Sequence, residues 1–451
     1  VGYSTLTGYT NLSTYTPAPL KEISSNEVLA KIKNGTDVEY SHVIIKGDLD
    51  LSQLGLPIGF IDRRDNRYSW GGDTGWGDSI GRDVAIIFSK ISIEDSLIEG
   101  NIDIGYAFFM KPVKFQSTRF NDTVSIQFSD FIEEANFKKC QFNKDTYIIS
   151  CVFNRDASFE EADFNERTTF RDSQFKNNAD FALSNFDGPA DFSESIFDEI
   201  SDFHSANFNE RLDFSGCQFN NEAYFGYSGP PLKTIGDAIG SGYTYDVGSY
   251  ISDFAPWGTG MSGYGYGLNF GGITDFSHSD FRDIVDFSGR QFKQSANLES
   301  IIFNGFVSFN QTTFVSDSYF SSSIFKKGVD FNMSQFRGNT SFEGAEFFGF
   351  IDLTKTTFSK LDLYWPSDTR LICNDGLTYL NLIKNFRDLE HFELADDVYY
   401  MYRQWRQDRT SWLDANKYLD LLAWLSCGYG VRPGYPLYWS VFLIFAFGII
   451  Y

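Results

Sequence analysis

The sequence predicts a mainly β solenoid, a coil of short strands that repeats along most of the chain. Phenylalanine, with 48 copies, recurs at alternating gaps of five and six residues, as in the stretch ADFALSNFDGPADFSESIF from Ala179 to Phe197. A small residue usually stands two positions before each Phe, as at Ala179 and Ala190. Neither the helical period of 3.6 nor the strand period of two produces these gaps, so the chain must turn a corner between successive apolar residues.

The repeat is long, which makes the predicted architecture specific. It runs from Ile93 to Phe225, 132 residues or twelve periods of eleven, and again from Phe276 to Phe358. On each short side, one large and one small side chain point inward around an outward residue, and a turn rich in Asn, Asp, Gly and Ser follows. Cys140, Cys151 and Cys217 take the small position. We therefore interpret them as small buried residues.

The repeated triplets resemble the pentapeptide-repeat motif A-(D/N)-(L/F)-x-x. They read ADF at 162–164, 179–181 and 190–192, and ANF at 206–208, and the resemblance covers roughly residues 84–360. It implies a right-handed, four-sided (quadrilateral) β-helix. Sides of five, six, five and six residues give a turn of 22 residues instead of 20, and Phe in place of the Leu of many relatives would fill the wider interior. We expect about ten turns and a rod of about 45–50 Å at the strand spacing of ~4.8 Å.

Four parts follow one another along the chain. Residues 1–37 predict an N-terminal tail and a capping helix, because Ser24 to Glu27 has the spacing of a capping box. Residues 38–360 predict the β-helix, with insertions at about 58–82 and 226–270 where the repeat breaks. Residues 361–434 predict a helical cap, since 377–411 has helical periodicity. Residues 435–451 contain no charged residue and predict the start of a transmembrane helix.

The two insertions are rich in Gly, Tyr and Trp, and they are the first candidates for binding. Loops on a rigid scaffold often carry binding residues, and exposed Trp and Tyr suit contacts with sugars or proteins. The alternative is that these aromatic side chains pack on the flank of the rod and shield it. The candidate binding residues are Trp70, Trp76, Tyr243, Tyr245, Trp257, Tyr264 and Tyr266.

Aspartates 22 residues apart are candidates for a metal site. On a 22-residue turn they would stack, and stacked carboxylates could hold Ca²⁺. The alternative is that each Asp accepts a hydrogen bond from an amide of its own turn. The four His residues are scattered along the chain, so neither a multi-His metal centre nor another cofactor is predicted. The stacked pairs are Asp180 with Asp202, Asp191 with Asp213, and Asp330 with Asp352.

Several features permit an external location. Residue 1 is Val, and the stretch after it lacks the regions of a signal peptide, which is typical of a mature N-terminus. Cys373 and Cys427 lie outside the repeat, and a disulfide between them is one hypothesis. Six N-x-S/T sequons permit glycosylation, at Asn11, Asn34, Asn121, Asn310, Asn332 and Asn339.

Charge and motifs exclude several classes of function. The net charge of −23 repels phosphate backbones, so we expect no nucleic acid as a partner. No Ser/His/Asp set, phosphate-binding loop or metal-ligand spacing is visible, and we predict that the protein is not an enzyme. Gly428-Tyr429-Gly430 matches the core of a potassium-channel filter, but Ser426 and Cys427 precede it and the apolar run comes after it, which argues against a filter.

The C-terminal block LIKNFR…ADDVYYMYRQWR…CGYGVRPGYPLYWS resembles the tail of archaeal membrane-bound pentapeptide-repeat proteins, some of which continue into an ion-channel-like region. The resemblance implies a non-enzymatic cell-surface protein of the envelope. A membrane helix would anchor it, and its acidic rod would lie outside and bind a protein partner or a second copy. One alternative is a sensory or accessory domain of an ion channel whose pore lies beyond residue 451. The other, implied by the resemblance to soluble acidic pentapeptide-repeat proteins, is a DNA-mimic inhibitor of a topoisomerase. The charge of residues 126–225, with 20 Asp and Glu against 8 Lys and Arg, suits this role.

Overall fold

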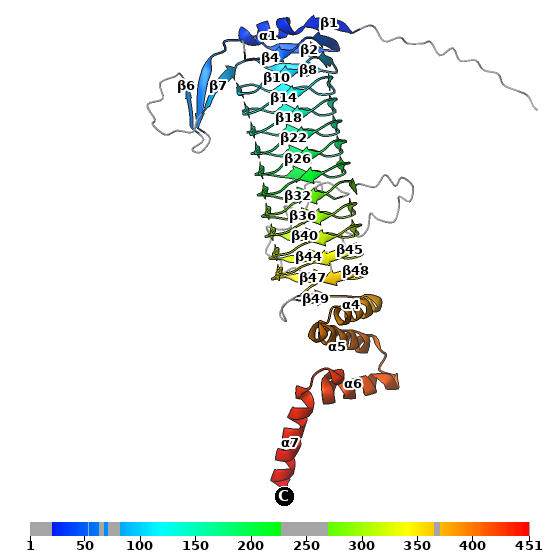
Figure 1. The fold of residues 1–451 in the computed structure, drawn as a ribbon. Coiled ribbons are helices and arrows are strands. Elements are labelled where there is room, and N and C mark those ends of the chain that lie inside the picture. Colours follow the sequence, from blue (N-terminus) through cyan, green and yellow to red (C-terminus); the bar gives the residue numbers. More distant parts are fainter. Residues whose placement is uncertain are drawn as a thin grey trace, which may run out of the picture.

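The molecule is a rod of stacked turns with helices at both ends (Figure 1). The computed structural model describes residues 20–52, 54–62, 67–70, 82–226, 269–364 and 370–450. Each regular turn has four short strands, and each strand pairs in parallel with the strand 22 residues further on. Ala157 thus pairs with Ala179, and Ala179 pairs with Ser201. The predicted four-sided β-solenoid with about 22 residues per turn is confirmed.

We number the four sides in the order in which the chain meets them from β2 onward. Side 1 comprises β2 (Val38–Ser41), β8 (Ile91–Glu94), β12 (Val113–Lys114), β16 (Ala135–Asn136), β20 (Ala157–Ser158), β24 (Ala179–Asp180), β28 (Ser201–Asp202), β32 (Ala223–Tyr224), β36 (Val285–Asp286), β40 (Phe306–Ser308), β44 (Gly328–Asp330), β47 (Phe350–Asp352) and β49 (Arg370–Ile372). Side 2 comprises β1 (Lys21–Ser24), β3 (Val43–Lys46), β9 (Leu97–Glu99), β13 (Arg119–Phe120), β17 (Gln141–Phe142), β21 (Asp163–Phe164), β25 (Asn185–Phe186), β29 (Asn207–Phe208), β33 (Asn269–Phe270), β37 (Gln291–Phe292) and β41 (Thr313–Phe314).

Sides 3 and 4 complete each turn. Side 3 comprises β4 (Leu49–Asp50), β10 (Ile102–Asp103), β14 (Val124–Ser125), β18 (Thr146–Tyr147), β22 (Thr168–Thr169), β26 (Ala190–Asp191), β30 (Leu212–Asp213), β34 (Thr274–Asp275), β38 (Ala296–Asn297) and β42 (Ser318–Tyr319). Two longer strands, β45 (Gln335–Ser341) and β48 (Thr357–Asp362), run along both side 2 and side 3. Side 4 comprises β7 (Arg82–Ile87), β11 (Ala107–Phe109), β15 (Asp130–Phe131), β19 (Val152–Phe153), β23 (Gln174–Phe175), β27 (Ile196–Phe197), β31 (Gln218–Phe219), β35 (Asp280–Phe281), β39 (Ile302–Phe303), β43 (Ile324–Phe325) and β46 (Glu346–Phe347).

The rod is longer than the expected ten turns. The sheet on side 1 has thirteen strands, one for each turn. At the ~4.8 Å strand spacing the stack is about 60 Å long, and the expected 45–50 Å is too short. The additional turns use smaller apolar residues, such as Val38, Val43 and Leu49 near the N-terminus, all buried. They lie outside the unbroken Phe repeat, so counting that repeat missed them.

The interior is a continuous apolar core. The inward Phe side chains of successive turns stack into columns and are essentially inaccessible to solvent. Polar side chains at the small position are also accommodated in the core, because they donate to a backbone carbonyl of the preceding turn. Ser195 Oγ donates to Phe170 O at 2.9 Å, and Cys217 Sγ lies 3.0 Å from Phe192 O. Cys140 and Cys151 occupy equivalent buried positions, as predicted.

The five-residue gaps are corners with a special backbone conformation. The third residue of each such corner lies in the left-handed region, and it recurs every eleven positions, as at Glu161 (φ 55°), Asp172 (φ 57°) and Leu183 (φ 59°). The corner is closed by a backbone hydrogen bond such as Ala162 N to Phe159 O, 3.0 Å. A β-turn with positive φ at its third position reverses the chain tightly. This conformation accounts for the shorter gap.

Two insertions leave the rod without disturbing its register. Ile44 pairs with Leu97, 53 positions away, and Phe208 pairs with Phe270, 62 positions away, yet both pairs belong to consecutive turns. The first insertion contains β5 (Ile58–Asp62) and β6 (Arg67–Trp70), which extend the sheet of side 4 as antiparallel strands beside β7.

Helices cover both ends of the stack. At the N-terminal end, α1 (Ser25–Lys33) buries Val28 and Ile32 against the first turn, and Ser24 caps the helix by accepting from Asn26 N at 3.3 Å. At the other end, α4 (Gly376–Asp388) covers the last turn. Its Asn385 acts like one more strand residue, because its side chain both donates to Leu361 O (2.7 Å) and accepts from Leu361 N (3.0 Å).

The remaining helices extend away from the rod (Figure 1). Helix α5 (Phe392–Arg409) packs on α4 and is followed by α6 (Ala415–Cys427), the short helix η1 (Gly428–Gly430) and α7 (Gly434–Ile450). In the part of the chain that the structure describes, no helix has both the length and the apolarity needed to cross a membrane. The predicted membrane-anchored envelope location is therefore wrong for these residues.

Candidate interaction surface

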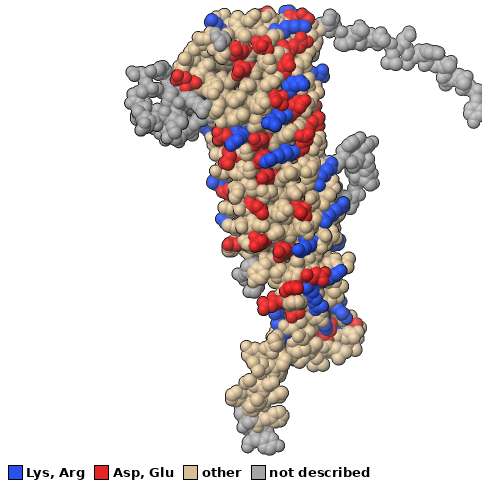
Figure 2. Space-filling model, viewed as in Figure 1, with Lys and Arg blue, Asp and Glu red and all other residues tan. Residues whose placement is uncertain are grey.

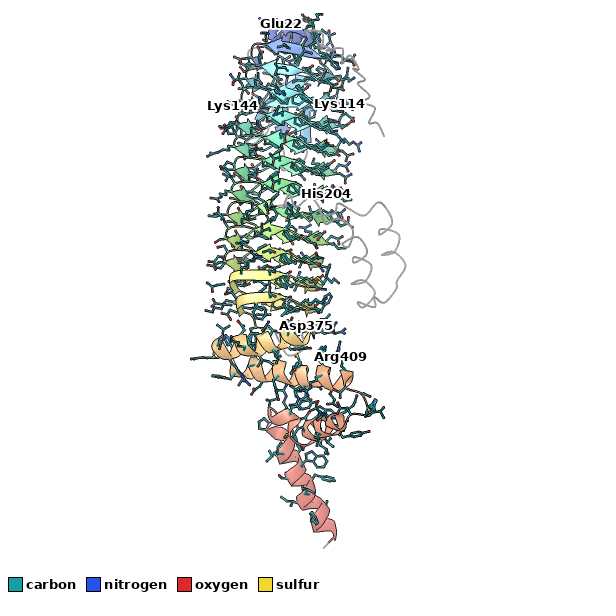
Figure 3. The ribbon with its side chains drawn as sticks, turned by 90° about the vertical axis from the view of Figure 1, so that its right-hand side faces the viewer. Glu22, Lys114, Lys144, His204, Asp375 and Arg409 are labelled. Carbon is teal, nitrogen blue, oxygen red and sulfur yellow. The ribbon has the colours of Figure 1, made fainter. Side chains whose placement is uncertain are left out.

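The outward residues of the rod form vertical columns, and two opposite sides carry aspartates. On side 1, Asp180 pairs with Asp202, and Asp330 pairs with Asp352. On side 3, three consecutive turns carry stacked carboxylates, because Asp191 pairs with Asp213 and Asp213 with Asp275. Figure 3 shows the two flanks at opposite edges, with Lys114 and His204 on one and Lys144 on the other. The predicted 22-residue stacking of these aspartates is thus observed.

Each stacked aspartate accepts a hydrogen bond from the backbone N–H two residues further along the chain. The Oδ1 atom of Asp191 accepts from Ser193 N at 2.9 Å, and that of Asp213 accepts from Ser215 N at 3.0 Å. The same residue spacing is used on side 1, where Asp180 Oδ1 accepts from Ala182 N at 3.0 Å. These bonds explain why Asp recurs at this position whether or not a ligand is present. The described residues contain no group of three or more metal-ligating side chains placed to hold an ion. The calcium hypothesis therefore stays an untested prediction.

Burial changes the protonation of the side 1 aspartates. Burial raises the pKa of Asp180 to about 6, against the lowering effect of the hydrogen bond from Ala182 N, and the charge of Asp202 adds to the rise. Burial likewise raises the pKa of Asp330 to about 6. His204 Nδ1 lies 2.7 Å from Asp202 Oδ1, and this hydrogen bond raises the pKa of His204. Side 1 is therefore acidic but partly neutralised near neutral pH.

Side 2 carries an amide ladder that the sequence analysis missed. Asn143 Nδ2 donates to Asn121 Oδ1, and Asn165 Nδ2 donates to Asn143 Oδ1, both at 3.0 Å. Asn207 Nδ2 bonds to Asn185 Oδ1 in the same way in the neighbouring column. The sequence signal is Asn recurring at the 22-residue spacing. Each rung ties one turn to the next, so these amides stiffen the rod.

The corners carry ion pairs between turns. Lys138 pairs with Glu160, Lys139 pairs with Glu161 at 3.2 Å, and each pair joins residues 22 positions apart. Because the partners are exposed or half-exposed, each pair stabilises the rod by no more than ~1 kcal/mol. Figure 2 shows that Lys and Arg are interspersed among Asp and Glu on the face in view.

The predicted aromatic binding residues fall almost entirely outside the described residues. Trp70 is the last residue of β6, and only its backbone is described. The others lie outside the described ranges, namely Trp76, Tyr243, Tyr245, Trp257, Tyr264 and Tyr266. Their role in binding stays a prediction.

The predicted sequons occupy different environments. Asn34 and Asn339 are exposed, Asn332 is half-buried, and Asn11 lies outside the described residues. Two others already use their amide groups within the rod: Asn121 Oδ1 accepts from Asn143 Nδ2, and Asn310 Nδ2 donates to Asp330 Oδ2 at 3.2 Å. Glycosylation is therefore sterically simplest at Asn34 and Asn339, and it stays a prediction at every site.

The remaining cysteine and histidine predictions can be placed directly. All five cysteines are free, so the hypothetical disulfide between Cys373 and Cys427 is absent. Burial raises the pKa of Cys373 to about 12, which keeps its thiol protonated. His391 lies 3.5 Å from Asp362, far along the rod from His204.

Arg290 is the residue that sequence reasoning missed most clearly. It stands where other turns have Ser, Thr, Cys or Ala, and its side chain is completely buried. Its Nη2 donates to Phe203 O at 2.9 Å, its Nη1 donates to Ala206 O, and its Nε donates to Phe225 O. Burial lowers the pKa of Arg290 to about 9, and Asp286 opposes that shift. The guanidinium thus links the turn that follows the second insertion to the turns that precede it.

The Gly428-Tyr429-Gly430 sequence forms a structural corner. Gly428 ends α6 in the left-handed conformation, and Tyr429 is buried against α5. Arg403 lies 4.8 Å from the Tyr429 ring and pairs with Asp420. The tyrosine therefore anchors α6 and α7 to the cap.

A filled β-solenoid defines a class of scaffold protein, and this class is typically non-catalytic. Among family models, one described as pentapeptide repeats (nine copies) matches residues 137–184, 148–196 and 181–229. The chain therefore carries pentapeptide repeats in the middle of its rod. Comparisons with curated proteins and with solved structures give no match.

Proposed function

We propose that the chain is a non-catalytic interaction scaffold whose rod binds a basic protein partner along the side 3 aspartates, defined as Asp191, Asp213 and Asp275. The filled interior carries this proposal. The inward Phe side chains leave the core closed to solvent, so the described rod offers its outer surface and its length, about 60 Å, as the means of acting on other molecules.

The side 3 aspartates favour a cationic partner for an electrostatic reason. Three carboxylates stand on consecutive turns, about 4.8 Å apart, and repel one another. A Lys- or Arg-rich segment lying along the column would relieve this repulsion, and the net charge of −23 would steer it there. Arg211 already pairs with Asp213 at 2.9 Å from an exposed position, which shows that a guanidinium fits this column.

Side 1 is the weaker candidate for the same partner. Asp330 is 9 % exposed and Asp352 only 1 %, so these carboxylates present little surface. Asp202 is occupied by His204. Side 3 has three partly exposed carboxylates on consecutive turns, of which Asp213 is paired with the exposed Arg211.

The test removes the negative charges of the side 3 aspartates and keeps the hydrogen bond that each of these side chains accepts from the backbone. Replacing all three side 3 aspartates by Asn retains an Oδ1 acceptor for the turn amide and removes three negative charges. Chemical cross-linking in the native cell, with mass spectrometry, would compare the basic proteins captured by each chain. The triple Asn variant should lose a basic partner that the unmodified chain captures.

A matched control removes the same charge elsewhere. Glu133→Gln, Glu346→Gln and Glu393→Gln together alter three exposed carboxylates away from side 3. This control should capture the same partner as the unmodified chain. If both variants lose it equally, net charge and not the column determines binding, and if neither loses it, the proposal fails.

The two alternatives are less favoured by the surface. A DNA mimic needs a continuous anionic face, whereas Lys and Arg interrupt the acidic residues on the face in Figure 2. An accessory role for an ion channel stays a prediction, because no described residue tests it.

A further inference from the structure

The two helices beyond the cap, α6 and α7, are unusually apolar. Helices α6 and α7 carry thirteen large apolar side chains that are substantially exposed, among them Leu419 (63 %), Leu422 (61 %), Leu437 (66 %) and Ile444 (72 %). We call the exposed apolar surface of these two helices the tip. Monomeric soluble proteins rarely expose contiguous apolar surface on this scale.

Helix α7 is apolar on every side. Val441, Phe442, Leu443, Ile444 and Phe445 are consecutive, and all are between 46 % and 72 % exposed. At 100° per residue, five consecutive positions sweep the whole circumference of a helix. A helix of this kind is stable only when it is surrounded. Within the same chain, α6 covers one side of α7, where Trp439 Nε1 donates to Leu425 O at 2.8 Å.

The exposed area is large enough for a stable interface. A standard protein interface buries about 800 Å² on each partner. Thirteen large apolar side chains exposing roughly 100 Å² each amount to about 1,300 Å², judged from the area that such side chains bury. A partner that buries about two thirds of this area would reach the size of a standard interface.

The distribution of charge along the chain favours a second copy of the chain as the partner of the tip. Residues 376–451 contain seven Lys and Arg against eight Asp and Glu, so almost all of the net charge of −23 lies on residues 1–375. After Asp420 the only charged residue is Arg432, which pairs with Asp397 at 2.7 Å. Among the described residues, the tip presents no unpaired charge by which to recognise a different protein. It is also the place where two acidic rods can meet with least repulsion, because the tip projects beyond the cap (Figure 1).

We propose that the tip binds a second copy of this chain, forming a two-fold symmetric dimer in which α6 and α7 of each chain cover α7 of the other. Such an interface presents the same apolar patch from both chains. The rods then point away from each other. This inference does not depend on the partner proposed for side 3.

Light scattering of the full chain after size-exclusion chromatography tests the proposal. The expected mass is twice the chain mass of 51.4 kDa. Leu437→Gln, Val441→Gln and Ile444→Gln together make one face of α7 polar, at positions i, i+4 and i+7. Because these side chains are exposed, the rod should keep its circular dichroism and melting temperature, while the mass falls by half.

A matched control places the same three changes on the rod. Leu183→Gln, Ile273→Gln and Met333→Gln replace apolar side chains that are 51 %, 51 % and 42 % exposed, and this variant should remain a dimer. Three results would overturn the proposal: a monomeric unmodified chain, an aggregate whose mass grows without limit with concentration, or a triple α7 variant that is still dimeric. Flotation of the chain as a monomer on phosphatidylcholine–phosphatidylglycerol vesicles would also overturn it, since a lipid surface would then be the occupant.

Discussion

Phe159 and Phe181 stack almost parallel across one turn, with ring centroids 4.9 Å apart and ring planes 5° apart. The centroid separation matches the strand spacing of ~4.8 Å, so the backbone strands and the stacked rings repeat at the same distance along the rod. Rings of neighbouring columns meet edge to face, as Phe159 and Phe170 do at 5.0 Å and 80°. The core therefore combines the two arrangements that aromatic pairs favour.

Truncating one ring should be costly. Phe181→Ala would leave a cavity between Phe159 and Phe203, and we expect a loss of about 3–5 kcal/mol in the free energy of unfolding. Phe348→Ala, at a position 68 % exposed, should change it by less than about 0.5 kcal/mol. Denaturant unfolding with hydrogen exchange would locate the damage. Equal effects of the two changes would contradict the packed-column description.

Removing Arg290 should weaken the turns that it joins. Arg290→Met fills much of the same space without donors, and we expect a loss of more than about 3 kcal/mol. Arg290→Thr should lose less. Thr312, one turn on, donates to Phe287 O at 2.9 Å, and a threonine hydroxyl introduced in place of the guanidinium would reach Phe225 O similarly. Thermal unfolding of both variants would rank them. A Met variant as stable as the unmodified chain would show that the three carbonyl contacts contribute nothing.

Asp180 should make stability depend on pH. Burial raises its folded-state pKa to about 6, above the ordinary 3.8, so its contribution is full below pH ~4 and is lost as the pH rises through 6. Asp180→Asn keeps the acceptor for Ala182 N and should add about 1–3 kcal/mol at pH 8 but almost nothing at pH 4. Urea unfolding at both pH values measures the difference. Asp122→Asn, at an exposed corner, is the control, and a gain for Asp180→Asn that is the same at both pH values would refute the explanation.

The left-handed corners predict a stabilising substitution. Leu183 has φ 59° and is 51 % exposed, so Leu183→Asn removes an unfavourable conformation without emptying the core. We expect a gain of about 0.5–1 kcal/mol, since Asn tolerates this region better than Leu. The reverse change is Gly344→Ala at an equivalent corner (φ 69°), where the added Cβ would lie 3.6 Å from its nearest neighbour. It should cost about 1 kcal/mol, and a failure of the two melting temperatures to shift in opposite directions would rule out this account of the corners.

The sequence alone determined the repeat, the inward and outward positions and the length of the turn. It could do so because each turn contacts only its neighbours, so the same spacing of large and small inward residues recurs in every turn. Phe159, Phe181 and Phe203 are related by their spacing before any coordinates are known. The stacking of Asp191 on Asp213 follows from the same period.

Only the tertiary structure decided what depends on distant segments. The register across the insertions, as in Phe208 with Phe270, could not be counted through an irregular stretch. The number of turns was underestimated because turns near the N-terminus use smaller apolar residues such as Val38 and Leu49 in place of Phe. The role of Arg290 rests on carbonyls 65 to 87 positions earlier in the chain. The apolar C-terminal segment was predicted to start a membrane helix from its composition alone. Which of its side chains the rest of the described chain leaves exposed appears only in the fold.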